Sequence, residues 1–194
     1  MMDPFPNVLK PAPQPERIIL GVDPGTTVTG YGLIRLLGKQ MVVLQYGVIH
    51  LSKYEGQALK LAKIFERISQ IVEEFSPDEM ALEAPFFGKN IQSMLKLGRA
   101  QGVAMAVALS RQIPITEYAP KKVKLSVTGN GNAAKEQVAA MLVAQFGLKE
   151  VPELLDATDA LGVAVCHAYQ QQSTGGGRAK SWAAFVAENP KRLK

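Results

Sequence analysis

The stretch RIILGVDPGTTVTGYGL, residues 17–33, limits the possible folds of this chain more than any other part of the sequence. Arg17 to Val22 form an apolar run that Asp23-Pro24-Gly25 closes, a pattern typical of a buried strand ending in a tight turn. Threonines and glycines then lead to a second strand, Tyr31 to Leu37, so we expect a hairpin. Asp23 would lie at a rigid strand end open to solvent, where it could ligate a divalent metal or simply form the turn.

The composition is that of one globular domain. The 194 residues are 47% apolar and 20% charged, and no apolar run approaches the length of a membrane span. The Pro-rich start does not resemble a signal peptide, so a cytoplasmic protein is expected. We expect a disordered leader over residues 1–16, one folded domain over residues 17–171 and a flexible basic tail over residues 172–194.

Beyond the hairpin, the pattern alternates strands with helices. A third strand completes an antiparallel meander, an amphipathic helix covers the sheet, and two further strands flank a helix that is poor in charge. That helix, Asn90 to Leu109, is expected to pack in the core or against a second copy of the protein. The expected strands are 41–49, 79–83 and 113–118, and the expected helices are 58–75, 90–109, 120–124, about 133–146 and 156–169.

Three more acids lie at the ends of apolar elements. Glu83 closes the fourth strand after a helical crossover, which can make that strand a parallel neighbour of the first and bring Glu83 to the same sheet edge as Asp23. Asp156 and Asp159 are three residues apart in a predicted helix and therefore project from one face. One of them could serve as a helix cap, which leaves the other without a structural role. The single cysteine, Cys166, is explained by core packing, and His167 in the same helix is better explained as a core or surface histidine than as a metal ligand.

The charge distribution favours a polyanionic partner. The chain has a formal net charge of +5, and residues 84–135 hold eight Lys or Arg residues against one acid, a net +7. In this segment Gly129-Asn130-Gly131-Asn132 precedes a helix start at Lys135, which could bind a phosphate or could be a plain turn with a surface lysine. Four clustered carboxylates without histidine or thiolate ligands select Mg²⁺ or Mn²⁺, and two such ions can promote in-line displacement at phosphorus. The residues alone therefore indicate a metal-dependent phosphodiesterase that acts on nucleic acid.

Five runs of the sequence, spread over about residues 17–170, closely resemble the RuvC Holliday-junction resolvase family. They are GVDPGTTVTGYGLI, ALEAPFFGKN, LKLGRAQGVAMAVAL, ITEYAPKKVKLSVTGNGNAAKEQV and DATDALGVAVCHAY. The resemblance implies a ribonuclease-H-like α/β fold with a mixed five-stranded sheet, its first three strands antiparallel, flanked by helices. It also implies a homodimer that resolves four-way DNA junctions by paired symmetric nicks in recombination and repair, with a branch-migration motor complex as a further candidate partner.

The resemblance also assigns roles to individual residues. It makes Asp23, Glu83, Asp156 and Asp159 catalytic ligands of Mg²⁺ or Mn²⁺, with two ions in each site. Phe86 matches the aromatic residue that stacks at the opened junction, although Phe86 could be a core residue and its neighbour Phe87 could take the role. Lys124 and Lys135 match basic residues that contact DNA, and Lys121 belongs to the same basic run. The helix from Asn90 to Leu109 matches the one that faces the dimer partner.

Three other functions compete with this interpretation. Asp23-Pro24-Gly25-Thr26-Thr27 resembles the first phosphate loop of actin-like or sugar-kinase ATPases, but those proteins enclose their nucleotide between two such domains and this chain is about half the required length. A junction-binding protein without catalytic activity would use the acids only as caps, and the presence of all four acids argues against it. A related nuclease of ribosomal RNA precursors would leave Phe86 and the helix poor in charge unexplained.

Overall fold

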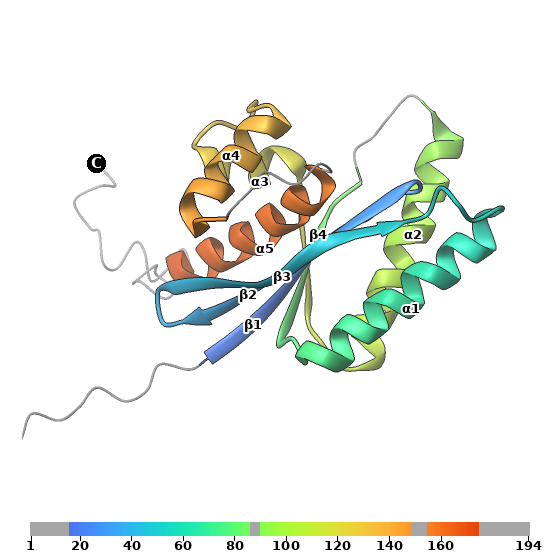
Figure 1. The fold of residues 1–194 in the computed structure, drawn as a ribbon, viewed down its shortest axis with the longest axis horizontal. Coiled ribbons are helices and arrows are strands. Elements are labelled where there is room, and N and C mark those ends of the chain that lie inside the picture. Colours follow the sequence, from blue (N-terminus) through green and yellow to red (C-terminus); the bar gives the residue numbers. More distant parts are fainter. Residues whose placement is uncertain (1–15, 86–89, 149–154, 175–194) are drawn as a thin grey trace, which may run out of the picture.

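Residues 16–85, 90–148 and 155–174 are described in a computed structural model of the chain (Figure 1). Within these residues, five strands form a single sheet in the order β3-β2-β1-β4-β5. The strands are β1 (Glu16–Asp23), β2 (Val28–Leu37), β3 (Gln40–His50), β4 (Glu79–Glu83) and β5 (Ile115–Tyr118). The first three pair antiparallel, whereas β1 pairs with β4, and β4 with β5, in parallel. The mixed five-stranded sheet expected from the sequence is confirmed.

The hairpin differs from the expectation in one detail. β2 begins at Val28 instead of Tyr31, because its pairing extends past the tight turn: Asp23 lies opposite Gly30, and Val28 lies opposite His50 on β3. Three further residues are therefore held by strand pairing, and the loop after Asp23 is short. The hydroxyl of Thr29 donates to the carbonyl of Gly25 at 3.0 Å and closes the turn.

Helices cover both faces of the sheet (Figure 1). On one face lie α1 (Gln57–Phe75) and α2 (Ile91–Ser110), and on the other lie α3 (Pro120–Thr128), α4 (Lys135–Phe146) and α5 (Leu155–Thr174). The amphipathic helix is confirmed in α1, where Ile64, Ile68, Ile71 and Val72 are buried at helical spacing. Leu59 and Phe65, which the sequence also assigned to the apolar face, are instead more than half exposed. Each helical layer encloses its own hydrophobic cluster against the sheet.

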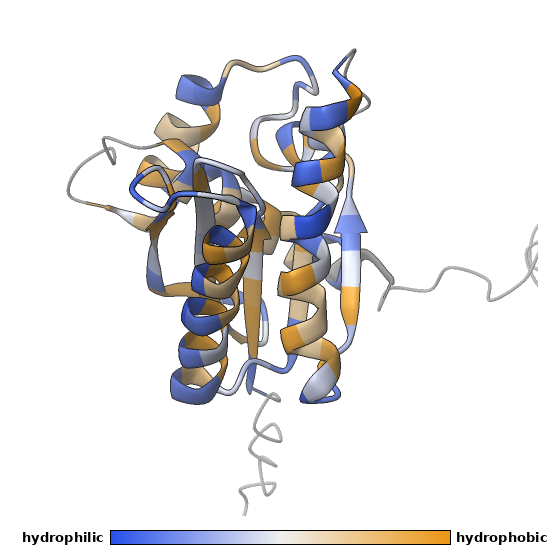
Figure 2. Cartoon of the chain, turned by 90° about the vertical axis from the view of Figure 1, so that its right-hand side faces the viewer, coloured by the Kyte–Doolittle hydropathy of each residue, from blue (hydrophilic) through white to orange (hydrophobic). Residues whose placement is uncertain are grey.

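The layer formed by α1 and α2 exposes large apolar side chains. α2 buries Ala100, Ala104, Val107 and Ala108. Its other side carries Ile91, Leu95 and Leu109, which are between 57% and 71% exposed, and α1 adds Leu59 and Phe65. In Figure 2, where this layer faces the viewer, hydrophobic colour accordingly reaches the outer surface of the helices. The helix poor in charge is thus packed on one side only.

α5 is buried over its whole central part, and it is longer than expected. Its central residues from Ala157 to Ala168 are all buried, which agrees with core packing for Cys166 and His167. The helix continues to Thr174, beyond both Tyr169 and the domain boundary expected at residue 171. The sequence missed this extension because Gln171 looks like the start of a polar tail, whereas its side chain bonds to β1 and β4. Among the described residues, no helix has the length and apolar character needed to cross a membrane.

Candidate metal centre and nucleic-acid interface

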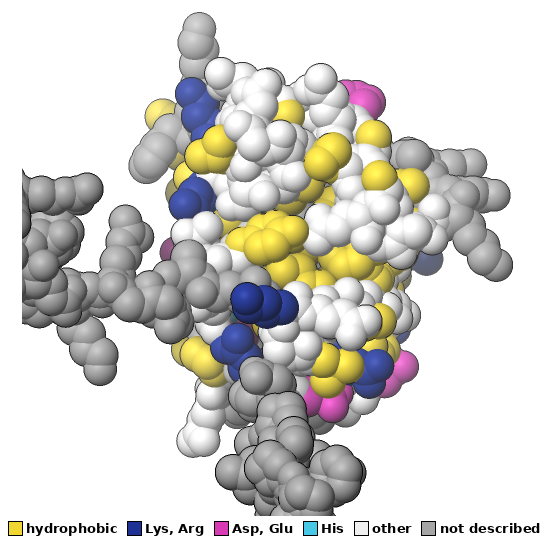
Figure 3. Space-filling view, turned by 90° about the vertical axis from the view of Figure 1, so that its left-hand side faces the viewer, with side chains coloured by type: hydrophobic (Ala, Val, Ile, Leu, Met, Phe, Trp, Pro, Cys, Tyr) yellow, Lys and Arg dark blue, Asp and Glu magenta, His cyan; other side chains and the backbone are white. Residues whose placement is uncertain are grey.

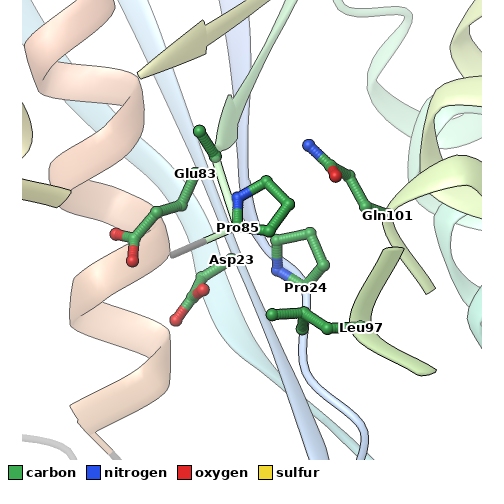
Figure 4. Close-up of a pocket in the computed structure, with 7 residues that line it drawn as sticks. Asp23, Pro24, Glu83, Pro85, Leu97 and Gln101 are labelled. Carbon is green, nitrogen blue, oxygen red and sulfur yellow. The ribbon is translucent and has the colours of Figure 1, made fainter. Parts of the chain in front are cut away.

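The predicted parallel pairing brings the first two acids together. β1 and β4 are in register up to Val22 opposite Leu82, so Asp23 and Glu83 follow at the same edge of the sheet. Figure 4 shows their side chains next to each other, with both carboxylates directed toward α5. Each acid is fixed by a strand whose preceding residue is fully buried. Two acids that are 60 positions apart in the sequence therefore occupy neighbouring, rigid positions.

The N-terminal part of α5 contributes the other two acids. Asp23, Asp156 and Asp159 each offer a carboxylate oxygen, and these oxygens all lie within 4.8 Å of one another. Glu83 completes the group: it is near enough to Asp159 that the Asp159 charge, together with burial, raises the pKa of Glu83. The structure thus brings together all four acids that the sequence singled out.

Glycines on the sheet let α5 approach this closely. A Cβ atom at Gly30, the residue paired with Asp23, would lie 1.9 Å from the carbonyl oxygen of Asp156, and one at Gly21 would lie 2.2 Å from the carbonyl oxygen of Ala160. Any larger residue at either position would collide with the helix backbone. The run of glycines in β1 and β2 is therefore explained by the distance between α5 and the strand that carries Asp23.

The acids repel one another in the folded protein. Burial, together with the charges of Glu83 and Asp159, raises the pKa of Asp23 to about 8. Burial and the charge of Asp159 raise the pKa of Glu83 to about 7, and burial also raises the pKa of Asp159. A desolvated group of carboxylates needs either protons or a cation to be stable. Oxygen donors at this spacing fit a hard divalent cation, whereas a soft metal would need thiolate or imidazole ligands.

One lysine lies directly against this group. The Nζ atom of Lys135, at the first residue of α4, lies 2.5 Å from Oδ2 of Asp159 and 3.8 Å from Oδ1 of Asp156. Lys124 on α3 is near enough for its charge to lower the pKa of both Glu83 and Asp159. Lys121 lies one turn earlier on α3 and is exposed. Two of the three predicted DNA-binding lysines thus lie beside the acids, and the third extends the basic surface.

A pocket opens between the two strand ends and α2. Asp23, Pro24, Glu83, Ala84, Pro85, Leu97 and Gln101 line it (Figure 4). The volume of this pocket is about 160 Å³. Gln101 was not identified from the sequence. It is 6% exposed and donates from Nε2 to Oε1 of Glu117, a contact that no local pattern in the sequence indicates.

Phe86 and Phe87 lie outside the described residues.

On the opposite side of the molecule from Figure 2, Figure 3 shows Lys and Arg side chains spread over the face, hydrophobic side chains gathered near its centre and acidic side chains near its margins.

Comparisons with known proteins agree with this geometry. The family model described as crossover junction endodeoxyribonuclease RuvC matches residues 19–167. Proteins with that name from Cytophaga hutchinsonii and Bacteroides fragilis are 64% and 54% identical to the chain. The first alignment covers 92% of this chain and 89% of the relative, and the second covers 94% and 98%.

The fold has a close solved counterpart. The structure of Thermus thermophilus RuvC in complex with Holliday junction substrate matches with a TM-score of 0.76 and 31% identity, over 81% of this chain and 96% of the other. The yeast mitochondrial Holliday junction resolvase Ydc2, at 15% identity and a TM-score of 0.59, shares the fold. The ribonuclease-H-like architecture expected from the sequence is confirmed. With four acids and two lysines gathered at one sheet edge, and with these matches over most of its length, the chain belongs to the family of crossover junction endodeoxyribonuclease RuvC.

Proposed function

We propose that this chain is a Mg²⁺-dependent endonuclease that resolves four-way DNA junctions by paired, symmetric nicks. One observation carries the proposal: acids from β1, β4 and α5 meet at one sheet edge, where Lys135 and Lys124 adjoin them. A phosphodiester entering this site would meet a cation site on one side and lysine ammonium groups on the other. The name of the family and the junction bound in the Thermus thermophilus structure support DNA junctions as the substrate.

Asp23, Glu83, Asp156 and Asp159 are the proposed metal ligands, with two Mg²⁺ or Mn²⁺ ions in each site. Bound ions of this kind activate the attacking water and stabilise the leaving oxygen. The chain itself supplies the positions: Asp23 and Glu83 are fixed by strands, and Asp156 and Asp159 by a buried helix. Lys135 already neutralises part of the charge on Asp159 and would turn to the scissile phosphate when the acids are metal-bound.

Lys121, Lys124 and Lys135 are the proposed contacts to DNA phosphates, and Phe86 stays the predicted wedge that replaces base stacking at the opened junction. Stacking on an aromatic ring is worth about 1–3 kcal/mol per base, enough to favour the opened form.

A homodimer is the proposed assembly, because a four-way junction offers two equivalent strands to cut. The exposed apolar side chains on α1 and α2, among them Ile91 and Leu95, support this layer as the contact with the second copy. A helix of the second copy that packs on this layer would bury apolar side chains that are now more than half exposed. A cytoplasmic location and a branch-migration motor partner stay predictions.

The deciding experiment compares synthetic four-way, Y-shaped and linear duplex DNA with Mg²⁺ and with EDTA. We expect symmetric nicks on the four-way junction alone, none in EDTA, and none from Asp23→Asn, which should still bind the junction. A protein without catalytic activity would bind junctions and cut none of them. Equal cleavage of the linear duplex would contradict junction selectivity, and equal cleavage by Asp23→Asn would contradict the proposed metal site.

A further inference from the structure

A second group of polar side chains lies at the end of α5 opposite to the metal centre. His167 is 3% exposed, and its Nε2 atom lies 2.6 Å from Oε2 of Glu79 on β4. Its Nδ1 atom lies 2.8 Å from the hydroxyl of Tyr118 on β5. Arg17 on β1 donates to Oε1 of Glu79 at 3.1 Å, and Gln171, one turn further along α5, donates to Oε2. These five side chains form what we call the Glu79–His167 network.

The partners of His167 fix the orientation of its ring. A carboxylate only accepts hydrogen bonds, so Nε2 carries the proton and donates to Glu79. The Tyr118 hydroxyl, whose pKa is raised to about 12 by burial, forms the second hydrogen bond of the ring, at Nδ1. The imidazole is therefore bonded at both nitrogens, and it joins α5 to two strands through directional contacts.

The network and the metal centre connect the same two elements at opposite ends. β4 begins at Glu79 in the network and ends at Glu83 in the metal centre, while α5 runs from Asp159 beside Glu83 to His167 beside Glu79. The four strand steps span about 13 Å and the eight helical steps about 12 Å. Because these lengths match, a shift of α5 along β4 cannot preserve the contacts at one end while changing the other.

Between the two ends, α5 lies close against small residues of the sheet. Gly21 faces Ala160 and Ala164, and Gly32 faces Leu161. Small residues allow this close approach of the two backbones, and Leu161, Val163 and Val165 of α5 pack in the core. Hydrogen bonds lose strength steeply when donor and acceptor are displaced, so a buried ring bonded at both nitrogens adds a directional restraint on the position of α5 along β4.

We propose that the Glu79–His167 network sets the position of α5 along β4 and thereby keeps Asp156 and Asp159 within coordinating distance of Asp23. His167 is then a positioning residue for the nuclease reaction, and this inference rests on the proposed function. A misplacement of about 1 Å can cost about 100-fold in rate, and loss of outer supports typically costs about 10–100-fold in metal affinity.

The test measures Mn²⁺ binding by calorimetry and single-turnover junction cleavage, both well below the melting temperature of each variant. His167→Ala should weaken Mn²⁺ binding at least about tenfold and slow cleavage, by analogy with other outer supports of metal sites. His167→Gln keeps an N–H donor for Glu79 and should recover most of the binding. Val165→Ala is the matched control, since Val165 is fully buried on the same helix but lies outside the network. It should lower the melting temperature and leave Mn²⁺ affinity unchanged.

Equal Mn²⁺ affinity of folded His167→Ala and the unchanged protein would overturn the inference, and so would an equal loss in Val165→Ala. If His167→Ala does not fold, Glu79→Gln gives the answer, because it keeps the shape of the contact and removes its charge. Weaker Mn²⁺ binding by that variant supports the inference, and unchanged binding overturns it. Failure of the proposed function is distinguishable, because the unchanged protein would then bind no Mn²⁺ at the acids and cut no junction.

Discussion

Asp23→Asn should stabilise the metal-free protein while it abolishes cleavage. In the folded protein the pKa of Asp23 is raised to about 8, whereas in the unfolded chain it is near 4. Between these values the folded state binds more protons than the unfolded state, so the stability of the unchanged protein falls as the pH rises from about 4 to about 8. Four pKa units correspond to about 5 kcal/mol if the whole shift contributed.

Coulomb's law gives a repulsion energy of similar magnitude for Asp23. At 4.8 Å and an effective dielectric constant of about 20, each carboxylate pair costs about 3 kcal/mol, and Asp23 takes part in two pairs within the aspartate group. Lys135 offsets part of this repulsion, and a buried amide keeps part of the desolvation cost. We therefore expect a gain of about 2–3 kcal/mol at pH 8, or roughly 5–10 °C in melting temperature for a domain of this size.

Scanning calorimetry in EDTA at pH 5 and pH 8 measures the effect. The gain should be large at pH 8 and shrink to less than about 1 kcal/mol at pH 5, where Asp23 is protonated in the folded protein. In excess Mg²⁺ the unchanged protein should be more stable than Asp23→Asn, because it gains binding energy that the variant lacks. Glu74→Gln, at an exposed acid of α1, is the control and should change little at either pH. An Asp23→Asn variant no more stable than the unchanged protein at pH 8 would refute the argument that the acids repel one another.

Three further changes test other parts of the structure. Gly30→Ala should destabilise the protein by about 3 kcal/mol or more in chemical denaturation, since its Cβ would lie 1.9 Å from the Asp156 carbonyl oxygen. Gly98→Ala is the control, because Gly98 has open space around it and the change should be neutral or stabilising. Equal effects of the two changes would refute the close approach of α5. Lys135→Ala should weaken junction binding for all sequences and reduce the slope of log affinity against log salt by about 1, and an unchanged slope would remove Lys135 from the phosphate contacts. Phe86→Ala should slow cleavage of intact junctions more than of junctions already opened by mismatches, and similar losses on both would make Phe86 a packing residue.

Local sequence patterns predicted the parts of the site that depend on backbone topology. The strand ends at Asp23 and Glu83 followed from apolar runs closed by Pro, and their common edge followed from the helical crossover between them. The spacing of Asp156 and Asp159 placed both on one helical face. These inferences required only the direction of each element and the order in which elements pair.

Such local patterns could not predict contacts between side chains that are far apart in the sequence. Nothing local in β4 or α5 indicates that Glu79 meets His167, and Gln101 enters the pocket only because α2 packs across the strand ends. The true end of α5 was missed for the same reason, since Gln171 looks solvated until its partners on β1 and β4 are known. Tertiary contacts of this kind override the local preference of a polar residue for solvent.

The position of α5 in the chain has a consequence during synthesis. It is the last helix in the described part of the chain, yet it packs against β1 and β2, among the first elements to leave the ribosome. Until it emerges, α5 does not cover the glycine-lined face of the early hairpin, and two of the four proposed metal ligands, Asp156 and Asp159, are not yet part of the chain. The proposed metal centre can therefore form only after α5 has been synthesised and has docked against these early strands.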